Sequence, residues 1–263
     1  SLLKDVDAFD NNIVVTCDLG FIENQYLFGA FKVIPGDTKV SVTTNKMLML
    51  LPEEPMQPRL ADPRLGVSFM KVSQVESDRK GLDHTFYTKR WRVEPVDEAA
   101  HRRGETVEVK KPIVFYMDTL MPKAWKPYIK EGIEAWNEAF KKIGFKNVIR
   151  VMDFPKDDPN FDPENIKYSC IRYAPSTVAN AMGPSWIDPR SGEIINASVT
   201  VFHNIVQLVQ YWRFLQTAPA DEEVRDVVLR EDLLGDCIAY VLSHEVGHTL
   251  SLMHNMAGSS SIP

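Results

Sequence analysis

The sequence predicts an α+β fold, in which a β-rich N-terminal region precedes a mixed sheet with two long helices. Before residue 105, β-branched runs are bounded by turn residues. After residue 112, buried-type apolar runs occur together with residues at helical spacing, most clearly at 233–250. The 263 residues are 44% hydrophobic and 25% charged, which is typical of a globular protein with a sizeable core.

The N-terminal region is expected to contain short strands joined by turns, at residues 12–17, 39–44 and 85–93, with a short apolar run at 47–51. Residues 55–66 hold three prolines and are expected to form an ordered loop. Residues 97–111 are charged and poor in large apolar side chains, so a domain boundary is expected there. We predict a β-rich accessory or pro-region at residues 1–105 and a second domain at residues 106–263.

The second domain is expected to combine two helices with five strands. The first helix, 121–143, is amphipathic, and Pro122 and Pro127 obscure its start. The second helix covers residues 233–250. The expected strands are residues 113–116, 147–154, 168–173, 179–182 and 194–202. The acidic loop 156–165 is expected at the surface, with a calcium site as a weak alternative.

Composition and charge exclude several classes of function. A net charge of -6 argues against a nucleic-acid partner. No apolar run of about 18 residues is present, so no transmembrane segment is expected, and the first residues do not form a signal peptide. Cys17, Cys170 and Cys237 are widely separated, so we interpret them as ordinary buried thiols. A latency switch in which Cys17 covers a metal remains the alternative, and the oligomeric state is left open.

The motif His244-Glu245-Val246-Gly247-His248, followed by His254, predicts a metal site. His244 and His248 lie four residues apart, so on a helix they share one face and can reach one tetrahedral zinc. Glu245 projects roughly 100° away from His244, where a carboxylate can act as general base without ligating the metal. We therefore predict that Zn²⁺ is bound by the three histidines and that Glu245 is catalytic.

His254 can complete this site only if the helix ends early. On a continuous helix it would lie nearly two turns beyond His248. We therefore expect the helix to end near Ser251 and the chain to turn back. Three protein ligands and one open position are typical of a catalytic zinc site rather than a structural one. His203 follows an expected strand and is interpreted as structural, because the other three histidines already fill the ligand positions.

The run from His244 to Asn255 resembles the active-site segment of the metzincins, and more narrowly the large bacterial extracellular zinc-dependent met-zincin family. Segments 58–66, 90–95 and 180–194 are also similar to that family. The resemblance implies that residues 106–263 form the upper subdomain of a metzincin-like catalytic domain. It also implies a protein or peptide substrate bound along a sheet edge near residues 179–185, and an extracellular, periplasmic or cell-envelope location.

Two positions depart from the metzincin pattern. Ser251 stands where the family usually has Gly at the break of the helix, and a positive φ costs Ser roughly 1 kcal/mol or more. The family also carries a Met-containing turn after the third His. Met253 and Met256 lie too close to His254 to form it, so we expect a fragment that ends just after the zinc-binding motif, with the C-terminal part of the domain missing.

The function that these patterns favour is a zinc-dependent metalloendopeptidase, a hydrolase in which zinc activates water and Glu245 is the general base. A catalytically inactive, zinc-containing binding or scaffold domain is the alternative, supported by Ser251 and by the missing Met-containing turn. A zinc hydrolase that acts on something other than protein is a third hypothesis.

Overall fold

The computed structural model describes residues 2–23, 26–27, 31–32, 38–75, 81–226, 228–256 and 258–260. The fragment end expected at Pro263 lies outside them. The α+β class is confirmed. The chain forms two compact units: one comprises residues 1–51 and 164–167, and the other comprises residues 52–163 and 168–263. The domain boundary expected at residue 105 stays a prediction.

The first unit is built on a three-stranded antiparallel sheet in the order β1-β2-β5. Its strands are β1 (Leu2–Ala8), β2 (Asn12–Glu23) and β5 (Thr38–Met49), and a short hairpin joins β3 (Tyr26–Leu27) to β4 (Phe31–Lys32). The strand expected at 39–44 is confirmed but is longer, because β5 continues into the apolar run that begins at Met47. Asn45 and Lys46 stay in register opposite Thr16 and Val15, and Thr16 Oγ1 donates to Asn45 Oδ1 at 3.1 Å.

The second unit begins with a hairpin of β6 (Phe69–Val75) and β7 (Leu82–Thr88), after the 3-10 turn η1 (Pro63–Leu65). The strand expected at 85–93 ends earlier, at Thr88. Beyond it, the amide of Arg90 donates to the carbonyl of Gly192 at 3.0 Å, and the amide of Ile194 donates to the carbonyl of Arg90 at 2.8 Å. These two bonds form an isolated bridge to the chain at the start of β15 (Ile194–Ala197) rather than a longer hairpin.

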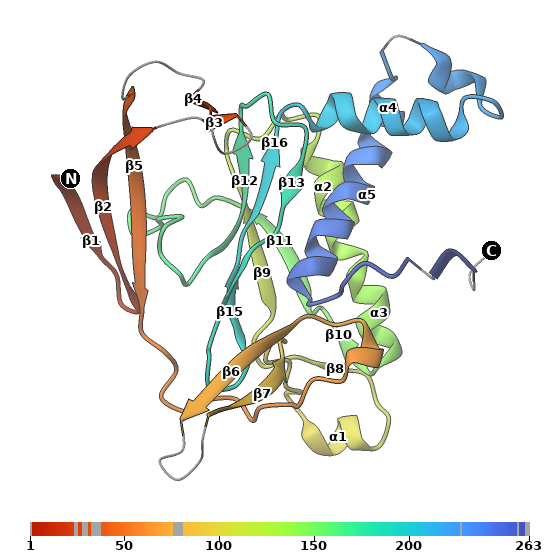
Figure 1. Ribbon diagram of the computed structural model, residues 1–263. Helices are drawn as coiled ribbons and strands as arrows, with labels where there is room; N and C mark the ends of the chain where they lie inside the picture. The colour runs from red at the N-terminus through yellow and green to blue at the C-terminus, as the bar shows by residue number, and fades with distance from the viewer. Residues whose placement is uncertain are drawn as a thin grey trace. The chain divides into compact units, whose positions relative to one another are not determined.

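A mixed five-stranded sheet is the centre of the second unit, in the order β11-β9-β12-β16-β13 (Figure 1). The first four strands are parallel and β13 is an antiparallel edge strand. The strand expected at 194–202 divides at Ser198, because β15 pairs with β14 whereas β16 pairs with β12. The strands are β9 (Ile113–Met117), β11 (Ile149–Asp153), β12 (Ser169–Ala174), β13 (Ala181–Met182), β14 (Ser185–Ile187), β15 (Ile194–Ala197) and β16 (Val199–Phe202).

Shorter elements complete the second unit. Asp97 caps α1 (Glu98–Arg102), because its side chain accepts from the amide of Ala100 at 2.9 Å. A two-stranded parallel pair joins β8 (Val107–Glu108) to β10 (Phe145–Lys146). Two 3-10 turns, η2 (Glu222–Arg225) and η3 (Gly258–Ser260), lie toward the C-terminus.

The helix expected at 121–143 is two helices, α2 (Lys126–Glu134) and α3 (Trp136–Lys142), interrupted at Ala135. α2 begins at Lys126 rather than at the expected residue 121. Pro127 then lies in the first turn of the helix, where the missing N–H of proline costs nothing. The helix expected at 233–250 is α5 (Glu231–Thr249).

The sequence pattern did not predict α4 (Ile205–Thr217). Ile205 and Val209 are buried one turn apart, but the opposite face carries exposed Tyr211, Phe214 and Leu215. Apolar side chains on both faces leave little helical periodicity to recognise. Among the described residues, no helix has the length and apolar character needed to cross a membrane.

Close packing of α2 against α5 fixes the position of α5 beside the sheet (Figure 1). A Cβ atom at Gly132 of α2 would lie 2.2 Å from the backbone oxygen of Ala239 in α5. Reciprocally, a Cβ atom at Gly235 of α5 would lie 2.3 Å from the ring of Tyr128 in α2. The two glycines therefore let the helix axes approach more closely than any larger residue would allow.

Gly132→Ala is expected to lower the free energy of unfolding. Overpacking costs about 1–3 kcal/mol, and the higher helix propensity of Ala offsets at most about 1 kcal/mol. The measurement is chemical denaturation of the chain. Gly20→Ala is the matched control, because a Cβ atom there meets nothing within 4 Å. Equal stability of the two variants would show that the helices are not in such close contact.

Candidate metal centre

The metal motif occupies the last turns of α5 and the turn that follows. α5 gives way to a C-cap at Leu250, and Ser251 has φ 75°. The amide of Ser251 donates to the carbonyl of His248 at 2.9 Å, and the amide of Leu252 donates to the carbonyl of Gly247 at 3.0 Å. This pair of bonds is a Schellman motif, which reverses the chain at a left-handed residue. The expected end of the helix near Ser251 is confirmed.

After the turn, the chain pairs with a segment far earlier in the sequence. Leu252 forms an antiparallel bridge with Val67, and the amide of Met253 donates to the carbonyl of Gly66 at 2.9 Å. These backbone bonds fix the direction of the returning chain. His254 is thereby placed beside the last turns of α5 instead of beyond the end of the helix.

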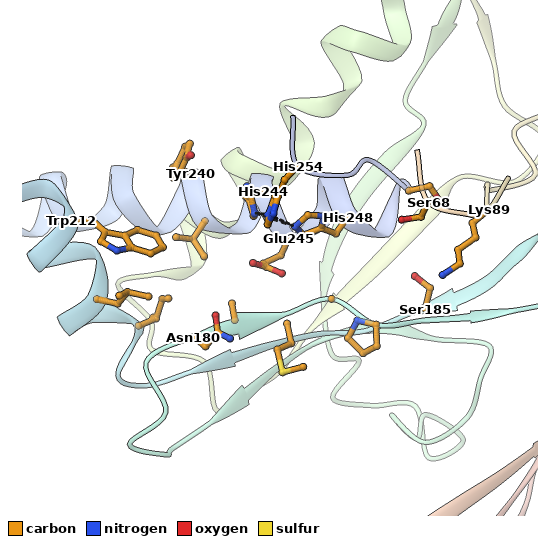
Figure 2. A pocket seen from close by; sticks show the side chains of 18 residues that line it. Ser68, Lys89, Asn180, Ser185, Trp212, Tyr240, His244, Glu245, His248 and His254 are labelled. Atoms are coloured by element: carbon orange, nitrogen blue, oxygen red, sulfur yellow. Dashed lines mark hydrogen bonds between the residues drawn. The ribbon is translucent and has the colours of Figure 1, made fainter. Parts of the chain in front are cut away.

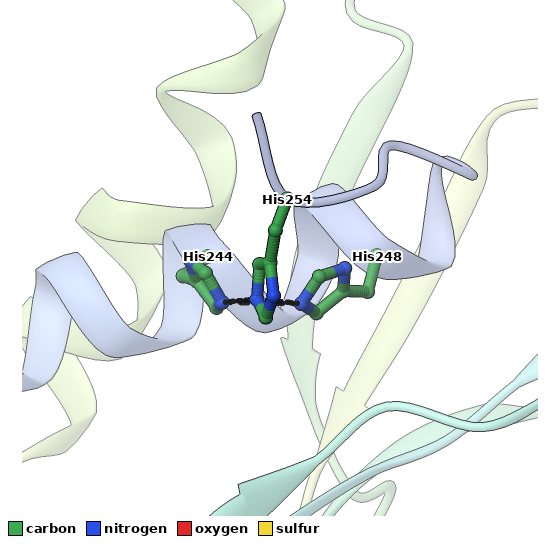
Figure 3. A group of neighbouring side chains, drawn as sticks. All are labelled: His244, His248 and His254. Carbon is green, nitrogen blue, oxygen red and sulfur yellow. Dashed lines mark hydrogen bonds between the residues drawn. The ribbon is translucent and has the colours of Figure 1, made fainter. Parts of the chain in front are cut away.

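The three histidines of the motif converge on one point (Figure 3). Nε2 of His244 lies 3.1 Å from Nε2 of His254 and 3.1 Å from Nε2 of His248, and the third separation is 3.2 Å. A tetrahedral zinc at about 2.0–2.1 Å from each nitrogen requires separations of about 3.3–3.4 Å. The observed separations are shorter than this by about 0.1–0.3 Å, so a small outward shift of the rings would accommodate one metal ion.

The hydrogen bonding of His248 favours the ligating tautomer. Its Nδ1 lies 2.9 Å from the carbonyl oxygen of Leu252. A carbonyl oxygen can only accept, so Nδ1 carries the proton and donates it. In the neutral ring Nε2 then has a free lone pair directed at the centre of the triangle, as is usual where an outer hydrogen bond orients a metal-ligating histidine.

The neutral form of His244 is also favoured. Burial lowers the pKa of its imidazole, and the neighbouring rings of His248 and His254 lower it further. Only a neutral imidazole can donate a lone pair to a metal, so the environment of the triangle favours the form that binds.

Glu245 stands next to the triangle without joining it. Its side chain points from α5 into the space between the helix and β13 (Figure 2). Burial raises the pKa of its carboxyl group, opposed by the charge of His248. A carboxylate with a raised pKa is a stronger base than a solvated one, which suits proton transfer near neutral pH.

The edge of the sheet lies close to the motif because of a glycine. A Cβ atom at Gly183 would lie 3.0 Å from the carbonyl oxygen of Glu245 and 3.2 Å from Cγ2 of Thr249. A larger residue would push the chain after β13 away from α5. The small residue therefore sets the width of the space into which Glu245 points.

Two tryptophan side chains from outside α5 donate hydrogen bonds to its backbone. Trp91 Nε1 donates to the carbonyl of Thr249 at 2.9 Å, and Trp136 Nε1 donates to the carbonyl of Ser243 at 2.9 Å. The first bond satisfies a carbonyl at the end of the helix, where no intrahelical partner exists. Both bonds restrain the backbone on which the histidines stand.

A cleft of about 730 Å³ runs between α5 and the sheet edge, past the triangle and Glu245 (Figure 2). One end, here called the apolar end, is lined by Ile205, Leu208, Trp212, Tyr240 and Val241. The other, here called the lysine end, is lined by Ser68, Lys89 and Ser185. The floor between them is residues 180–184, within the segment 179–185 that the resemblance indicated as a substrate-binding edge.

Most of this lining was missed by the sequence analysis. Ser68 and Lys89 come from the chain before and after the β6–β7 hairpin, and Trp212 comes from the unexpected α4. None of them lies near the motif in the sequence, and none belongs to a pattern with a metal-binding or catalytic meaning. Only the tertiary contacts bring them to the cleft.

His203 is held by neighbouring rings, in agreement with a structural role. Its Nδ1 lies 2.6 Å from the hydroxyl of Tyr173, and its ring stacks on Trp125 with centroids 5.8 Å apart. Within the described residues, the three histidines of the motif form the one cluster of three or more His, Cys, Asp or Glu suited to a metal. The loop at 156–165 contributes no such cluster.

The three cysteines are free thiols. Cys170 is buried, and burial raises the pKa of its thiol to about 12. Cys17 and Cys237 are half-buried, and burial also raises the pKa of the Cys237 thiol. The interpretation as ordinary buried thiols therefore describes Cys170 best.

Residues 226–263 match the family model described as Met-zincin. The C-terminal segment of the chain is thus similar to the met-zincins. The matched residues include α5 with its histidines and the returning segment, so the metal geometry and the family match coincide. The histidine cluster is consistent with the metal site typical of met-zincins.

A second family covers the other end of the chain. Residues 1–96 match the model described as Domain of unknown function (DUF5117). Residues 52–96 of that match belong to the same compact unit as the met-zincin segment. No curated protein and no solved structure matches the chain.

Ser251→Gly is expected to raise the free energy of unfolding by about 1 kcal/mol, because a left-handed conformation costs an L-residue roughly that amount. The buried Ser251 hydroxyl also lacks a hydrogen-bond partner within the described residues. Ser251→Ala removes this hydroxyl but keeps the strained backbone, so it separates the two effects. Denaturation of both variants is the measurement. If the Gly variant is no more stable than the Ala variant, backbone strain at this turn does not lower the stability of the chain.

Proposed function

We propose that this chain carries the zinc centre of a metallopeptidase. The observation that supports the proposal is the triangle of imidazole nitrogens, 3.1–3.2 Å apart, with the Glu245 carboxyl group one residue from the first histidine. Three imidazole ligands suit zinc among the common biological metals, and three protein ligands leave a position open for reaction.

Each of the four side chains has a separate part in this proposal. Nε2 of His244, His248 and His254 would hold the zinc, which when bound lowers the pKa of water and polarises a carbonyl. The carboxylate of Glu245 accepts a proton from the attacking water and later delivers it to the nitrogen of the leaving amine. Its raised pKa reduces the energy needed to hold that proton between the two steps.

The cleft fits an extended peptide. β13 lies at the end of the strand order, so within the described residues its outer edge has no paired strand. A peptide can add to such an edge through main-chain hydrogen bonds, and this would carry it past Glu245. An extracellular, periplasmic or cell-envelope location is part of the proposal and rests on the family resemblance alone.

A catalytically inactive, zinc-containing scaffold is the second candidate. It is favoured by Ser251, which strains the turn that joins His248 to His254. The two functions share the metal site and differ in turnover, so metal content and peptide hydrolysis must be measured separately.

Zinc is expected to bind with one ion per chain, and its affinity should fall as the pH drops below about 6. A protonated imidazole cannot ligate a metal. Since the pKa of His244 is lowered, protonation of this ring needs a lower pH than that of a free imidazole. The measurement is competitive zinc titration between pH 5 and pH 8. Zinc binding that is absent at neutral pH, or does not change with pH, contradicts the proposal.

His254→Ala serves as the ligand test in the same titration, and His84→Ala is its matched control. His84 is exposed on β7, and its Nδ1 lies 3.2 Å from Oγ of Ser73. We expect zinc affinity to fall at least about a hundredfold in His254→Ala, more than the 10–100-fold effect of an outer-shell change, and to stay unchanged in His84→Ala. Unchanged affinity in both variants would place the third ligand elsewhere.

Glu245→Gln is expected to retain zinc but to lower peptide hydrolysis by about 10²–10⁴-fold, the usual contribution of a general base. Zinc content and cleavage of a broad peptide library are measured on the same preparation. Loss of the metal would identify Glu245 as a ligand. Full activity would assign the base to another group, and no activity in the unmodified chain would favour the scaffold.

A further inference from the structure

The lysine end of the cleft contains a cation that the proposed catalytic reaction does not use. Lys89 is half-buried, and its side chain points into the cleft toward Ser185 (Figure 2). Its backbone amide donates to the carbonyl of Ser68 at 3.0 Å, which fixes the position of the residue. Within the described part of the chain, the ammonium group has no carboxylate partner.

The charges around Lys89 favour an anion in the cleft. Among the described lining residues, Glu245 is the sole carboxylate, and it serves as the proposed base. A bound zinc ion would add further positive charge. Lys89 and Glu245 balance in formal charge across the whole cleft, but the lysine end itself is lined by Lys89 and two serines without a carboxylate. A cation of this kind attracts and orients complementary negative groups.

We propose that Lys89 is a specificity residue that selects peptides with a carboxylate at the lysine end, assisted by the hydroxyl groups of Ser68 and Ser185. The inference rests on the proposed function, because it names the substrate class of the same site. Ammonium and hydroxyl donors together satisfy a carboxylate, and a charge-assisted hydrogen bond is about twice as strong as a neutral one.

The direction of β13 decides which carboxylate is bound. The segment runs from Asn180, near the apolar end, to Ser185 at the lysine end (Figure 2). Antiparallel pairing is slightly more stable per residue than parallel pairing. A peptide added antiparallel to this edge runs from the lysine end to the apolar end. Its carboxylate is then an Asp or Glu side chain on the N-terminal side of the cleaved bond.

A peptide in the opposite direction would instead present its C-terminal side to Lys89. In that case the carboxylate could be a free C-terminus as well as a side chain. The two sources share their chemistry and differ in their position relative to the cleaved bond, so a peptide series can distinguish them.

The test uses the zinc-loaded chain and matched series of quenched fluorescent peptides. Asp or Glu is placed at successive positions N-terminal or C-terminal to a common centre, Asn or Gln replaces it in the neutral series, and the C-terminus is free or amidated. We expect peptides with Asp or Glu in the N-terminal series to be cleaved about tenfold faster at low substrate concentration than the matching peptides with Asn or Gln. The difference should appear in KM rather than kcat, because Lys89 does not contact the reacting bond.

Variants assign this preference to the side chain. Lys89→Met keeps the length of the side chain and should abolish the preference, and Lys89→Glu should reverse it toward peptides with Lys. Lys71→Met is the matched control, since Lys71 is exposed on β6 and does not line the cleft. An acidic preference that persists in Lys89→Met, or is lost equally in Lys71→Met, overturns the assignment.

Binding separates this inference from the proposed function. Affinity of the same peptides, labelled but unquenched, is measured by fluorescence anisotropy with zinc-loaded Glu245→Gln. If no peptide is cleaved but acidic peptides bind about tenfold more tightly and lose this advantage in Lys89→Met, the peptidase proposal fails and the carboxylate site stands. If peptides are cleaved and bound without regard to charge, the carboxylate site fails alone. A preference that depends only on a free C-terminus overturns the antiparallel assignment.

Discussion

The candidate metal centre depends on one backbone constraint, the reversal of the chain directly after α5. The Schellman bonds at Ser251 end the helix, and the pairing of Leu252 and Met253 with residues 66–67 directs the chain back. Without these two sets of hydrogen bonds, His254 would lie farther along the helix axis, and the three imidazole nitrogens would not come together. Residues 66–68 lie in the segment that matches DUF5117, and His254 lies in the segment that matches the Met-zincin model. The first segment therefore helps to position a candidate ligand in the second.

The remaining contacts serve to keep α5 in place. Gly132 and Gly235 let α2 pack directly on it, and the indole nitrogens of Trp91 and Trp136 bind two of its carbonyl groups. On the other side, Gly183 lets the sheet edge approach. A helix held on several sides moves little, and small displacements matter because misplacement of about 1 Å can cost about a hundredfold in rate. The part of the cleft that these contacts hold is thus the part that carries the proposed chemistry.

The sequence was most informative where a local rule applies. The spacing of His244 and His248 fixes a shared helix face, and the position of His254 requires an early helix end, which the structure has at Ser251. It was least informative where the outcome depends on partners far along the chain. The break at Ala135, the division at Ser198 and the whole of α4 are examples, since each depends on which distant element the segment packs against.

By itself, the sequence determined the α+β class and the set of residues that form the metal cluster, because both follow from periodicity and short-range spacing. The tertiary structure alone decided that Ser68 and Lys89 line the same cleft as those histidines. It also decided that the edge strand passes next to Glu245 and that residues 66–67 support His254. The physical reason is that these contacts join segments more than 50 residues apart, whose approach is set by the packing of sheet and helices rather than by any local pattern.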